Sequence, residues 1–249
     1  MKQRSTYLKS ALSAVALGAA SLCAFAESPS DAFVADFTNA FEKRGNIAPD
    51  VKEAALARLK SHPSADSASR ALRKFFPALD IALEESDRTK SVEQLKKLTE
   101  TGDPFLSAEA HYAIGRRLIA DHRHEEAIAL FDKVAAQLAT HSLRAGEAHY
   151  YLGVCQEKML EKEKAIGTFE TMLAFFREDV SNRLRKDAED RVIQLKKDVD
   201  GSLGDVANHM GFSERKLGQT DSGERTQEVQ EHIVSMLDEL IAQAEKSPP

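Results

Sequence analysis

The sequence predicts an all-α protein whose antiparallel helix pairs stack into an α-solenoid. Apolar residues recur at helical spacing along most of the chain, and patterns typical of strands are scarce. Short turns separate the apolar runs, as they do in helical bundles and solenoids. One stretch of the chain also repeats itself at a fixed offset. With 42% hydrophobic residues among 249, the chain can bury a core, which excludes disorder throughout.

The first 26 residues have the form of a secretory signal peptide. Lys2, Arg4 and Lys9 are basic, an uncharged Ala-rich run follows them, and residues 24–26 read Ala-Phe-Ala, which suits a cleavage site. We expect cleavage after Ala26 and a mature protein that is periplasmic or secreted. No later stretch is apolar enough to span a membrane, so we expect no integral membrane segment after cleavage.

Two alternatives to cleavage after Ala26 concern the same segment. A retained membrane anchor is disfavoured because the uncharged run from Ser10 to Ala26 has only 17 residues. A lipoprotein is disfavoured because Leu22 precedes Cys23, where a lipobox needs a small residue. Cleavage would leave 31 cations against 40 carboxylates, a net charge of −9, which argues against a nucleic-acid partner. It would leave Cys155 as the lone thiol, expected to be a small core residue.

Residues 27–105 are expected to form an N-terminal helical region. Pro49 marks a helix start, Pro77 breaks or restarts a helix, and Pro104 follows a closing turn. We interpret residues 66–101 as a degenerate helix pair. The apolar stripes of the region lie at residues 51–59, 68–76, 79–83 and 92–98.

Residues 106–178 contain the internal repeat. The string AHYAIG at 110–115 aligns with AHYYLG at 148–153, an offset of 38 residues. Glycine, which has no Cβ, lets a second helix approach closely, a small residue faces it there, and an aromatic fills the gap to the next pair. After each glycine, Ala follows at twelve residues and Phe four residues later, at the same offset: Ala127 and Phe131, then Ala165 and Phe169.

This spacing of glycine, small residue and aromatic resembles the tetratricopeptide repeat (TPR). The period here is 38 residues, where the family has about 34, so we expect the second helix of the first repeat to extend through Leu138. The closing proline of the family pattern is absent from both repeats. The resemblance implies a concave groove lined by the first helix of each repeat. The implied partner-binding residues are Glu109, Tyr112, Arg116, Ile119, Glu147, Tyr150, Val154, Glu157 and Lys158.

Tyr112 and Tyr150 occupy equivalent positions in the two repeats. A tyrosine offers a flat apolar face and a hydroxyl, which suits a bound peptide. The alternative is that both rings pack against the neighbouring helix pair. His122 and His124 lie in a turn of the first repeat and lack a third ligand, so we expect no metal site there. We expect no cofactor and no catalytic residue, since no nucleophile–base or phosphate-loop motif stands out.

Beyond the repeats, residues 179–200 predict a helix that extends the solenoid, and residues 201–249 predict a helical segment. The stripe Val229, Ile233, Met236 and Leu240 is expected to fold back on the repeats as a cap, or to pair with a second copy as a homodimer seam. Residues 202–217 also resemble the helix-turn-helix of AraC-type regulators, which makes a DNA-binding regulator the alternative function.

The sequence therefore favours an exported, non-enzymatic TPR-like scaffold or adaptor. In layout it resembles periplasmic TPR proteins of the bacterial cell envelope. We expect a protein or peptide partner and no nucleic acid.

Overall fold

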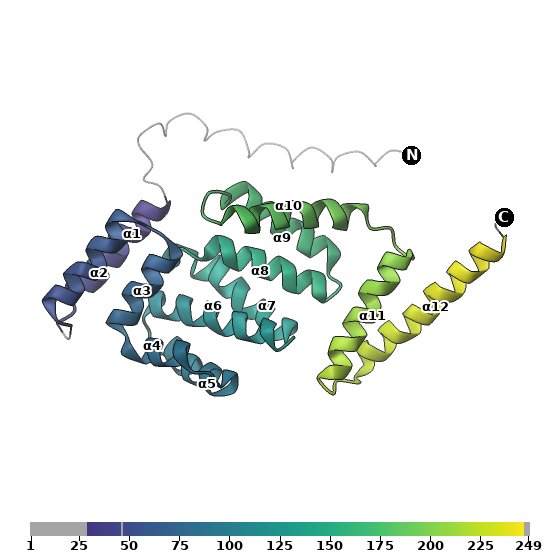
Figure 1. The fold of residues 1–249 in the computed structure, drawn as a ribbon, viewed down its shortest axis with the longest axis horizontal. Helices are drawn as coiled ribbons and strands as arrows, with labels where there is room; N and C mark the ends of the chain where they lie inside the picture. The colour runs from purple at the N-terminus through teal and green to yellow at the C-terminus, as the bar shows by residue number, and fades with distance from the viewer. Residues whose placement is uncertain (1–28, 46, 247–249) are drawn as a thin grey trace, which may run out of the picture.

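Twelve α-helices and no strand make up the described chain, which a computed structural model covers at residues 29–45 and 47–246 (Figure 1). The predicted signal peptide lies outside these residues. Consecutive helices from α4 to α10 pack against one another, which confirms the predicted all-α solenoid of TPR-like helix pairs. The helices are α1 (Pro29–Glu42), α2 (Pro49–Ser61), α3 (Ala65–Phe75), α4 (Pro77–Glu84), α5 (Arg88–Thr99), α6 (Pro104–Ala120), α7 (His124–Asp132), α8 (Ala145–Lys158), α9 (Lys162–Phe175), α10 (Asn182–Lys197), α11 (Leu203–Gly218) and α12 (Glu224–Lys246).

The two repeats are the helix pairs α6–α7 and α8–α9, and their glycines lie against buried rings. A Cβ on Gly115 would lie 2.7 Å from Cζ of Phe131, and one on Gly153 would lie 2.7 Å from Cε1 of Phe169. Both rings are fully buried. Real Cβ atoms do not come this close to their neighbours, so each glycine makes room for the phenylalanine ring of the second helix of its own repeat, and not for the small residue that we expected to face it.

The four extra residues of the 38-residue period are absorbed at the end of α7. A π-helical turn at Lys133–Gln137 continues this helix, Leu138 follows as its C-cap, and a 3₁₀ turn at Ala139–His141 leads to α8. The side chain of Val134 in the π-turn is fully buried. The predicted extension of the helix towards Leu138 is therefore present, in π rather than α geometry.

The N-terminal region is held by a cluster of phenylalanines. The rings of Phe41 and Phe75 stack with centroids 4.6 Å apart, and Phe37 packs on Phe41 at 4.3 Å. Phe105 joins the cluster from the start of α6. Pro77 separates α3 from α4, as predicted. Because this break gives three helices, residues 66–101 are α3, α4 and α5 and not the single helix pair that we expected.

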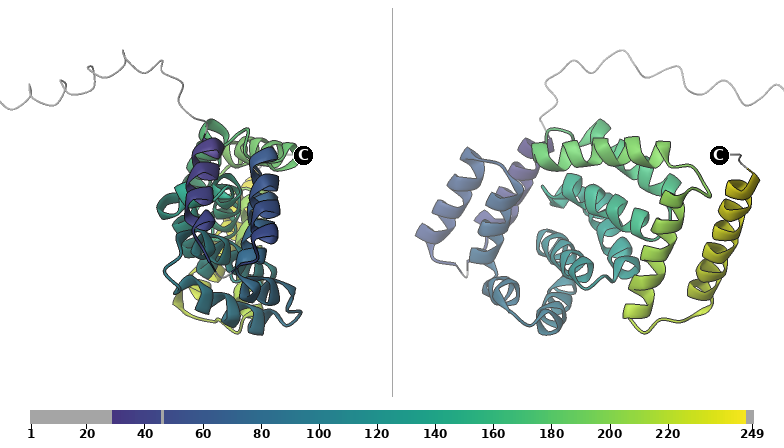
Figure 2. Two further views of the ribbon diagram at one scale, coloured as in Figure 1. Left: turned by 90° about the vertical axis from the view of Figure 1, so that its left-hand side faces the viewer. Right: turned by 45° about the vertical axis from the view of Figure 1, so that its right-hand side comes forward.

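The helices α11 and α12 form a hairpin at the end opposite to α1 and α2 (Figures 1 and 2). α11 joins the hairpin to the repeats through polar contacts to the turns between their helices. Arg215 donates to the carbonyl of Lys158 at 2.7 Å, and Gln219 donates to the carbonyl of His122 at 2.7 Å. Lys216 pairs with Glu125 at 2.8 Å.

Two predictions for the C-terminal segment are wrong. Residues 203–218 form one continuous helix, so the turn that a helix-turn-helix needs is absent and the DNA-binding alternative loses its motif. The apolar stripe of α12 packs on Val206 of α11 and not on the repeats, because the hairpin turn places α11 beside it. The same contact occupies the stripe that we considered as a homodimer seam.

Candidate interaction surface

The predicted groove residues lie along α6 and α8, but the structure buries three of them. Glu109, Tyr112 and Tyr150 are between 5% and 8% exposed. Their burial is inconsistent with rings that lie open to a peptide, and it agrees with the alternative of packing between helix pairs. The predicted residues that keep some or most of their surface in solvent are Arg116, Ile119, Glu147, Val154, Glu157 and Lys158.

Hydroxyl groups explain why the two tyrosines point inward. The hydroxyl of Tyr112 donates to Glu147 of the next helix pair, and that of Tyr150 donates to Asp187 of α10, at 2.6 Å. Burial raises the pKa of Tyr112 above its ordinary value. Burial also raises the pKa of Tyr150 to about 12, and the carboxylate of Asp187 adds to this shift. Each hydroxyl therefore stays protonated and links one helix pair to the next.

Arginines complete this ladder between the helices. Arg144 lies between helix pairs and pairs with Glu109 at 3.0 Å and with Glu147 at 3.3 Å. Arg191 of α10 contacts both Asp187 and Glu157, at 2.5 and 2.6 Å. The guanidinium of Arg116 lies 4.1 Å from the ring centroid of Tyr151. Because these charges are satisfied inside the chain, the ladder links successive helix pairs and offers few free groups to a ligand.

An acidic recess lies where this ladder meets the C-terminal hairpin. It has a volume of about 700 Å³ and lies between α8, α9, α10 and the hairpin. Of the predicted groove residues, Glu157 lines it. Leu160, Leu195 and Val199 give it apolar contacts. Seven carboxylates line it, those of Glu157, Glu163, Asp187, Asp190, Asp198, Asp200 and Asp205.

The two cations that line this acidic cavity are both engaged. Lys162 donates to the carbonyl of Asp198 at 2.8 Å and lies 3.3 Å from Asp200, while Arg191 holds Glu157 and Asp187. Seven carboxylates against two cations leave a surplus of five negative charges with the histidines neutral. Such a surplus in a recess concentrates the field and attracts cations.

Sequence reasoning missed this cavity. Five of its carboxylates fall between residues 187 and 205, and that local density was the available signal. No pattern in the sequence indicates that α11 and α12 stand beside α10 and close the recess. His209 and His232, one from each hairpin helix, lie on its far wall with ring centroids 5.1 Å apart.

The other candidate residues lie in the interior. Cys155 is fully buried, and burial raises the pKa of its thiol to about 12, so it packs as a core residue, as predicted. His124 is 6% exposed and its Nδ1 has no hydrogen-bond partner. Burial lowers the pKa of His124 to about 4, and the positive charges of Arg215, His122 and Lys158 add to the shift. Within the described ranges, no three potential metal ligands converge.

Comparison with known proteins shows no family for this chain. No family model matches the chain, and no curated protein matches it at a significant level. Among solved structures, the chain is similar to a kinesin light chain-like protein of Podosopora anserina, described as nearly identical TPR-like repeats. The two are 15% identical, the match covers 72% of this chain and 99% of the other, and the TM-score is 0.36.

Proposed function

We propose that the protein is an exported, non-enzymatic scaffold of the bacterial envelope that binds a cationic segment of a partner protein. The acidic cavity between α10 and the hairpin is the single observation that carries this proposal. TPR-like solenoids act as protein-interaction scaffolds, which is the coarse function that the fold supports. The cavity adds the chemistry of the partner: Lys or Arg side chains for the carboxylates, and an apolar residue against Leu195 and Val199.

The arrangement favours binding of such a segment for a physical reason. The carboxylates of Glu157, Asp187 and Asp190 are carried on α8 and α10, which the tyrosine–arginine ladder holds together, so little ordering of these helices is required when a ligand arrives. Surplus negative charge accelerates the encounter with a cationic partner and makes the affinity fall with salt. Val199 is 69% exposed, so an apolar contact is available beside the charges.

The export part of the proposal is supported by the sequence alone. The basic start, the uncharged run and the Ala-Phe-Ala string at residues 24–26 have the signal-peptide form. Among the residues that the structure describes, no helix is both long and apolar enough to cross a membrane. N-terminal sequencing of the protein from its native host should give Glu27 in the envelope fraction. A chain that starts at Met1 in the cytoplasmic fraction would contradict export.

Binding is tested with a pair of synthetic peptides. One is an amphipathic peptide of Lys and Leu, and the other carries Glu in place of Lys. The full chain should bind the Lys peptide with an affinity that falls as salt is raised, and should not bind the Glu peptide. Neutralisation of Glu163, Asp198 and Asp200 to their amides should weaken binding of the Lys peptide about tenfold, since three solvent-accessible charge pairs of modest strength are lost.

A matched triple variant controls for the loss of charge alone. Glu53, Glu93 and Asp132 are exposed carboxylates outside the cavity, and their conversion to amides changes the net charge equally. This control should bind the Lys peptide almost as well as the natural chain. If both triple variants weaken binding equally, the attraction is a property of the whole acidic chain and the cavity is not the site.

A further inference from the structure

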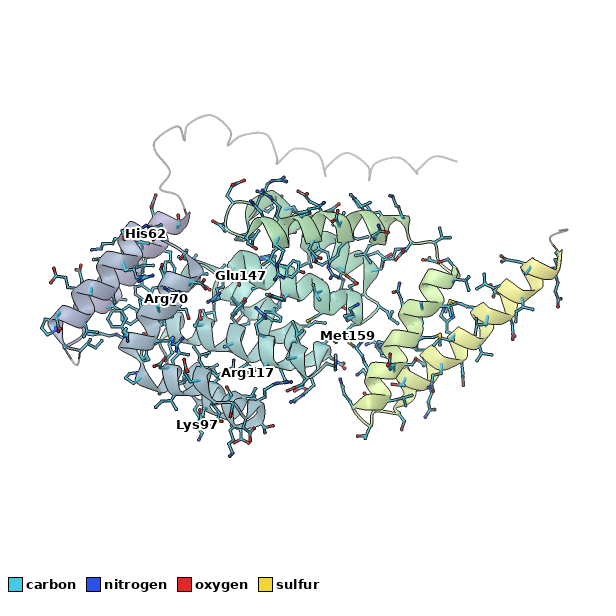
Figure 3. The ribbon with its side chains drawn as sticks, viewed as in Figure 1. His62, Arg70, Lys97, Arg117, Glu147 and Met159 are labelled. Carbon is cyan, nitrogen blue, oxygen red and sulfur yellow. The ribbon has the colours of Figure 1, made fainter. Side chains whose placement is uncertain are left out.

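The C-terminal hairpin carries an apolar face that nothing in the described chain covers. Eleven large hydrophobic side chains are exposed in the described structure, and six of them belong to this hairpin. Their exposure runs from 37% for Leu237 to 71% for Leu203. The six are Leu203, Met210 and Leu217 on α11, and Val234, Leu237 and Ile241 on α12. The yellow-green hairpin lies at one end of the molecule in Figure 3.

The three exposed apolar residues of α11 and the three of α12 lie on one side of the hairpin. Val206 of α11 packs on Ile233 and Met236 of α12, which fixes the inner sides of the two helices. At 100° per residue, each exposed set is rotated in the same sense from its inner side, towards the following residues. Because α11 and α12 run antiparallel, rotation in the same sense on each helix brings the exposed residues of both helices to the same side. We call this surface the hairpin face.

The solenoid lies on the other side of α11. Phe212 and Lys216 are rotated in the opposite sense from Val206, and Phe212 is buried while Lys216 holds Glu125 of the first repeat. Asp205 and His232, which line the acidic cavity, are rotated the same way as Phe212. The hairpin face is therefore turned away from the repeats and from the cavity.

The glycines of α11 point to a neighbour on this face. Gly204, Gly211 and Gly218 are spaced seven residues apart, each directly after one of the exposed apolar residues of α11. A Cβ at Gly218 would meet nothing within 4 Å, and at Gly204 and Gly211 it would meet only a polar side-chain end at 3.5 and 3.3 Å. By contrast, Gly115 and Gly153 lie against buried rings. Contacts inside the chain therefore do not account for the α11 glycines, although Gly211 in the helix interior weakens the helix.

We propose that the hairpin face is the interface of a symmetric dimer, in which it packs against the same face of a second copy. Two hairpins then form a four-helix bundle, with the glycines of α11 allowing close approach of the partner's helix. The face can pack against itself, since large apolar side chains lie along both helices, with Glu214 as the one carboxylate in its α11 stripe and Gln230 as a polar residue in its α12 stripe.

The size of the face fits a second copy. Six large side chains at roughly half exposure, with Ala207 and the glycines between them, present roughly 600 Å² per copy, so a dimer buries roughly 1,200 Å², the lower end for specific interfaces. The proposal does not depend on the proposed function, because the acidic cavity stays open on the opposite side. It also differs from the seam expected from the sequence, whose residues are already packed on α11.

Sedimentation equilibrium of the full chain tests the dimer. The natural chain should sediment as a dimer that dissociates on dilution. Met210→Lys combined with Val234→Lys should raise the dimer dissociation constant about a hundredfold, because two exposed apolar residues at the centre of the face become charged. The thermal melt of the dissociated variant should match that of the dissociated natural chain, since neither residue is buried in one copy.

Two controls keep the test specific. Ile193→Lys places the same charge at a 47% exposed apolar residue of α10, outside the face, and should leave the dimer intact. Gly211→Ala should weaken the dimer while Gly167→Ala, at an α9 glycine with nothing within 4 Å, should not. A natural chain that stays monomeric at about 100 µM, where weak interfaces associate, would overturn the proposal. So would a dimer that survives the double lysine variant, since the interface would then lie elsewhere.

Discussion

The two repeats and the C-terminal hairpin have the same kind of turn between their helices, but they differ in how much apolar surface they leave exposed to solvent. In α6–α7, α8–α9 and α11–α12, a residue with positive φ follows two residues after the last residue of the first helix. These residues are His122, Leu160 and Thr220, with φ of 60°, 62° and 59°. The next amide then donates back across the helix end, to Leu118, Gln156 and Lys216 respectively. The three hairpins are thus built alike at their turns.

Their faces differ. The repeats bury their glycines against Phe131 and Phe169 and pair their buried charges through Arg144. The C-terminal hairpin leaves its glycines and six large apolar side chains in solvent. A pattern of glycine and apolar residues on a helix therefore predicts close packing. Whether the neighbour belongs to the same chain depends on whether a later helix of that chain reaches the face.

The largest expected effect separates buried from exposed rings on one helix of the repeats. Phe169→Ala should lower the free energy of unfolding by about 3–5 kcal/mol, because a fully buried ring leaves a cavity. Phe175→Ala on the same helix removes a ring that is 76% exposed, and should change stability by less than about 0.5 kcal/mol. Denaturant unfolding of both variants measures the difference. Equal losses of stability in the two variants would contradict the burial of Phe169 and the exposure of Phe175 on α9.

The junction between repeats and hairpin predicts a dependence of stability on pH. The pKa of His124 is about 4 in the folded chain, against an ordinary value of 6.5, because the ring is buried beside Arg215, His122 and Lys158. Between pH 6.5 and pH 4, His124 therefore binds a proton in the unfolded chain but stays neutral in the folded chain. Stability contributed by neutral His124 is complete above pH 6.5 and is lost as pH falls towards 4, up to about 3 kcal/mol.

His124→Phe should remove this part of the pH dependence. A ring of similar size keeps the position filled but cannot take up a proton. His62→Phe, at an exposed residue after α2, is the matched control for replacing a histidine by phenylalanine. The measurement is the free energy of unfolding at pH 7 and pH 5. If the His124 variant loses as much stability on acidification as the natural chain, the group responsible lies elsewhere.

The smallest expected effect compares one glycine from each region. Gly153→Ala should destabilise by about 1–3 kcal/mol, because its Cβ would lie 2.7 Å from the ring of Phe169. Gly211→Ala should stabilise the dissociated chain by up to about 1 kcal/mol, since alanine favours the helix and Arg215 can move aside. Thermal melts at low protein concentration show whether each variant is more or less stable than the natural chain. If the melting temperatures of both variants shift in the same direction, the glycines of the repeats and of the hairpin do not differ in packing as described.

Features that local spacing determines could be predicted from the sequence. Gly115, Phe131 and their copies at an offset of 38 indicated the repeat pair, and the long period indicated the extension towards Leu138. Pro77 indicated the break between α3 and α4.

The features that could not be predicted depend on which helices pack against each other in the folded chain. An aromatic at the position of Tyr112 fits a ligand or a neighbouring helix equally well, and the hydroxyl–Glu147 contact that decides the matter joins residues 35 apart. The stripe of α12 shows that an apolar neighbour is needed without showing that α11 supplies it. The acidic cavity is formed by α8, α9, α10 and the hairpin, and no single segment of sequence contains it.

Binding at the acidic cavity is tested most directly by hydrogen–deuterium exchange of the full chain with and without the Lys and Leu peptide. We predict slower exchange in the second half of α10 and in the cavity-lining parts of α11 and α12, around Asp190, Asp205 and His232. Exchange in α2, α3 and α6 should not change. Protection that appears along α6 and the start of α8 instead, with none around Asp205, would place the partner in the groove implied by the TPR resemblance and contradict the assignment to the acidic cavity.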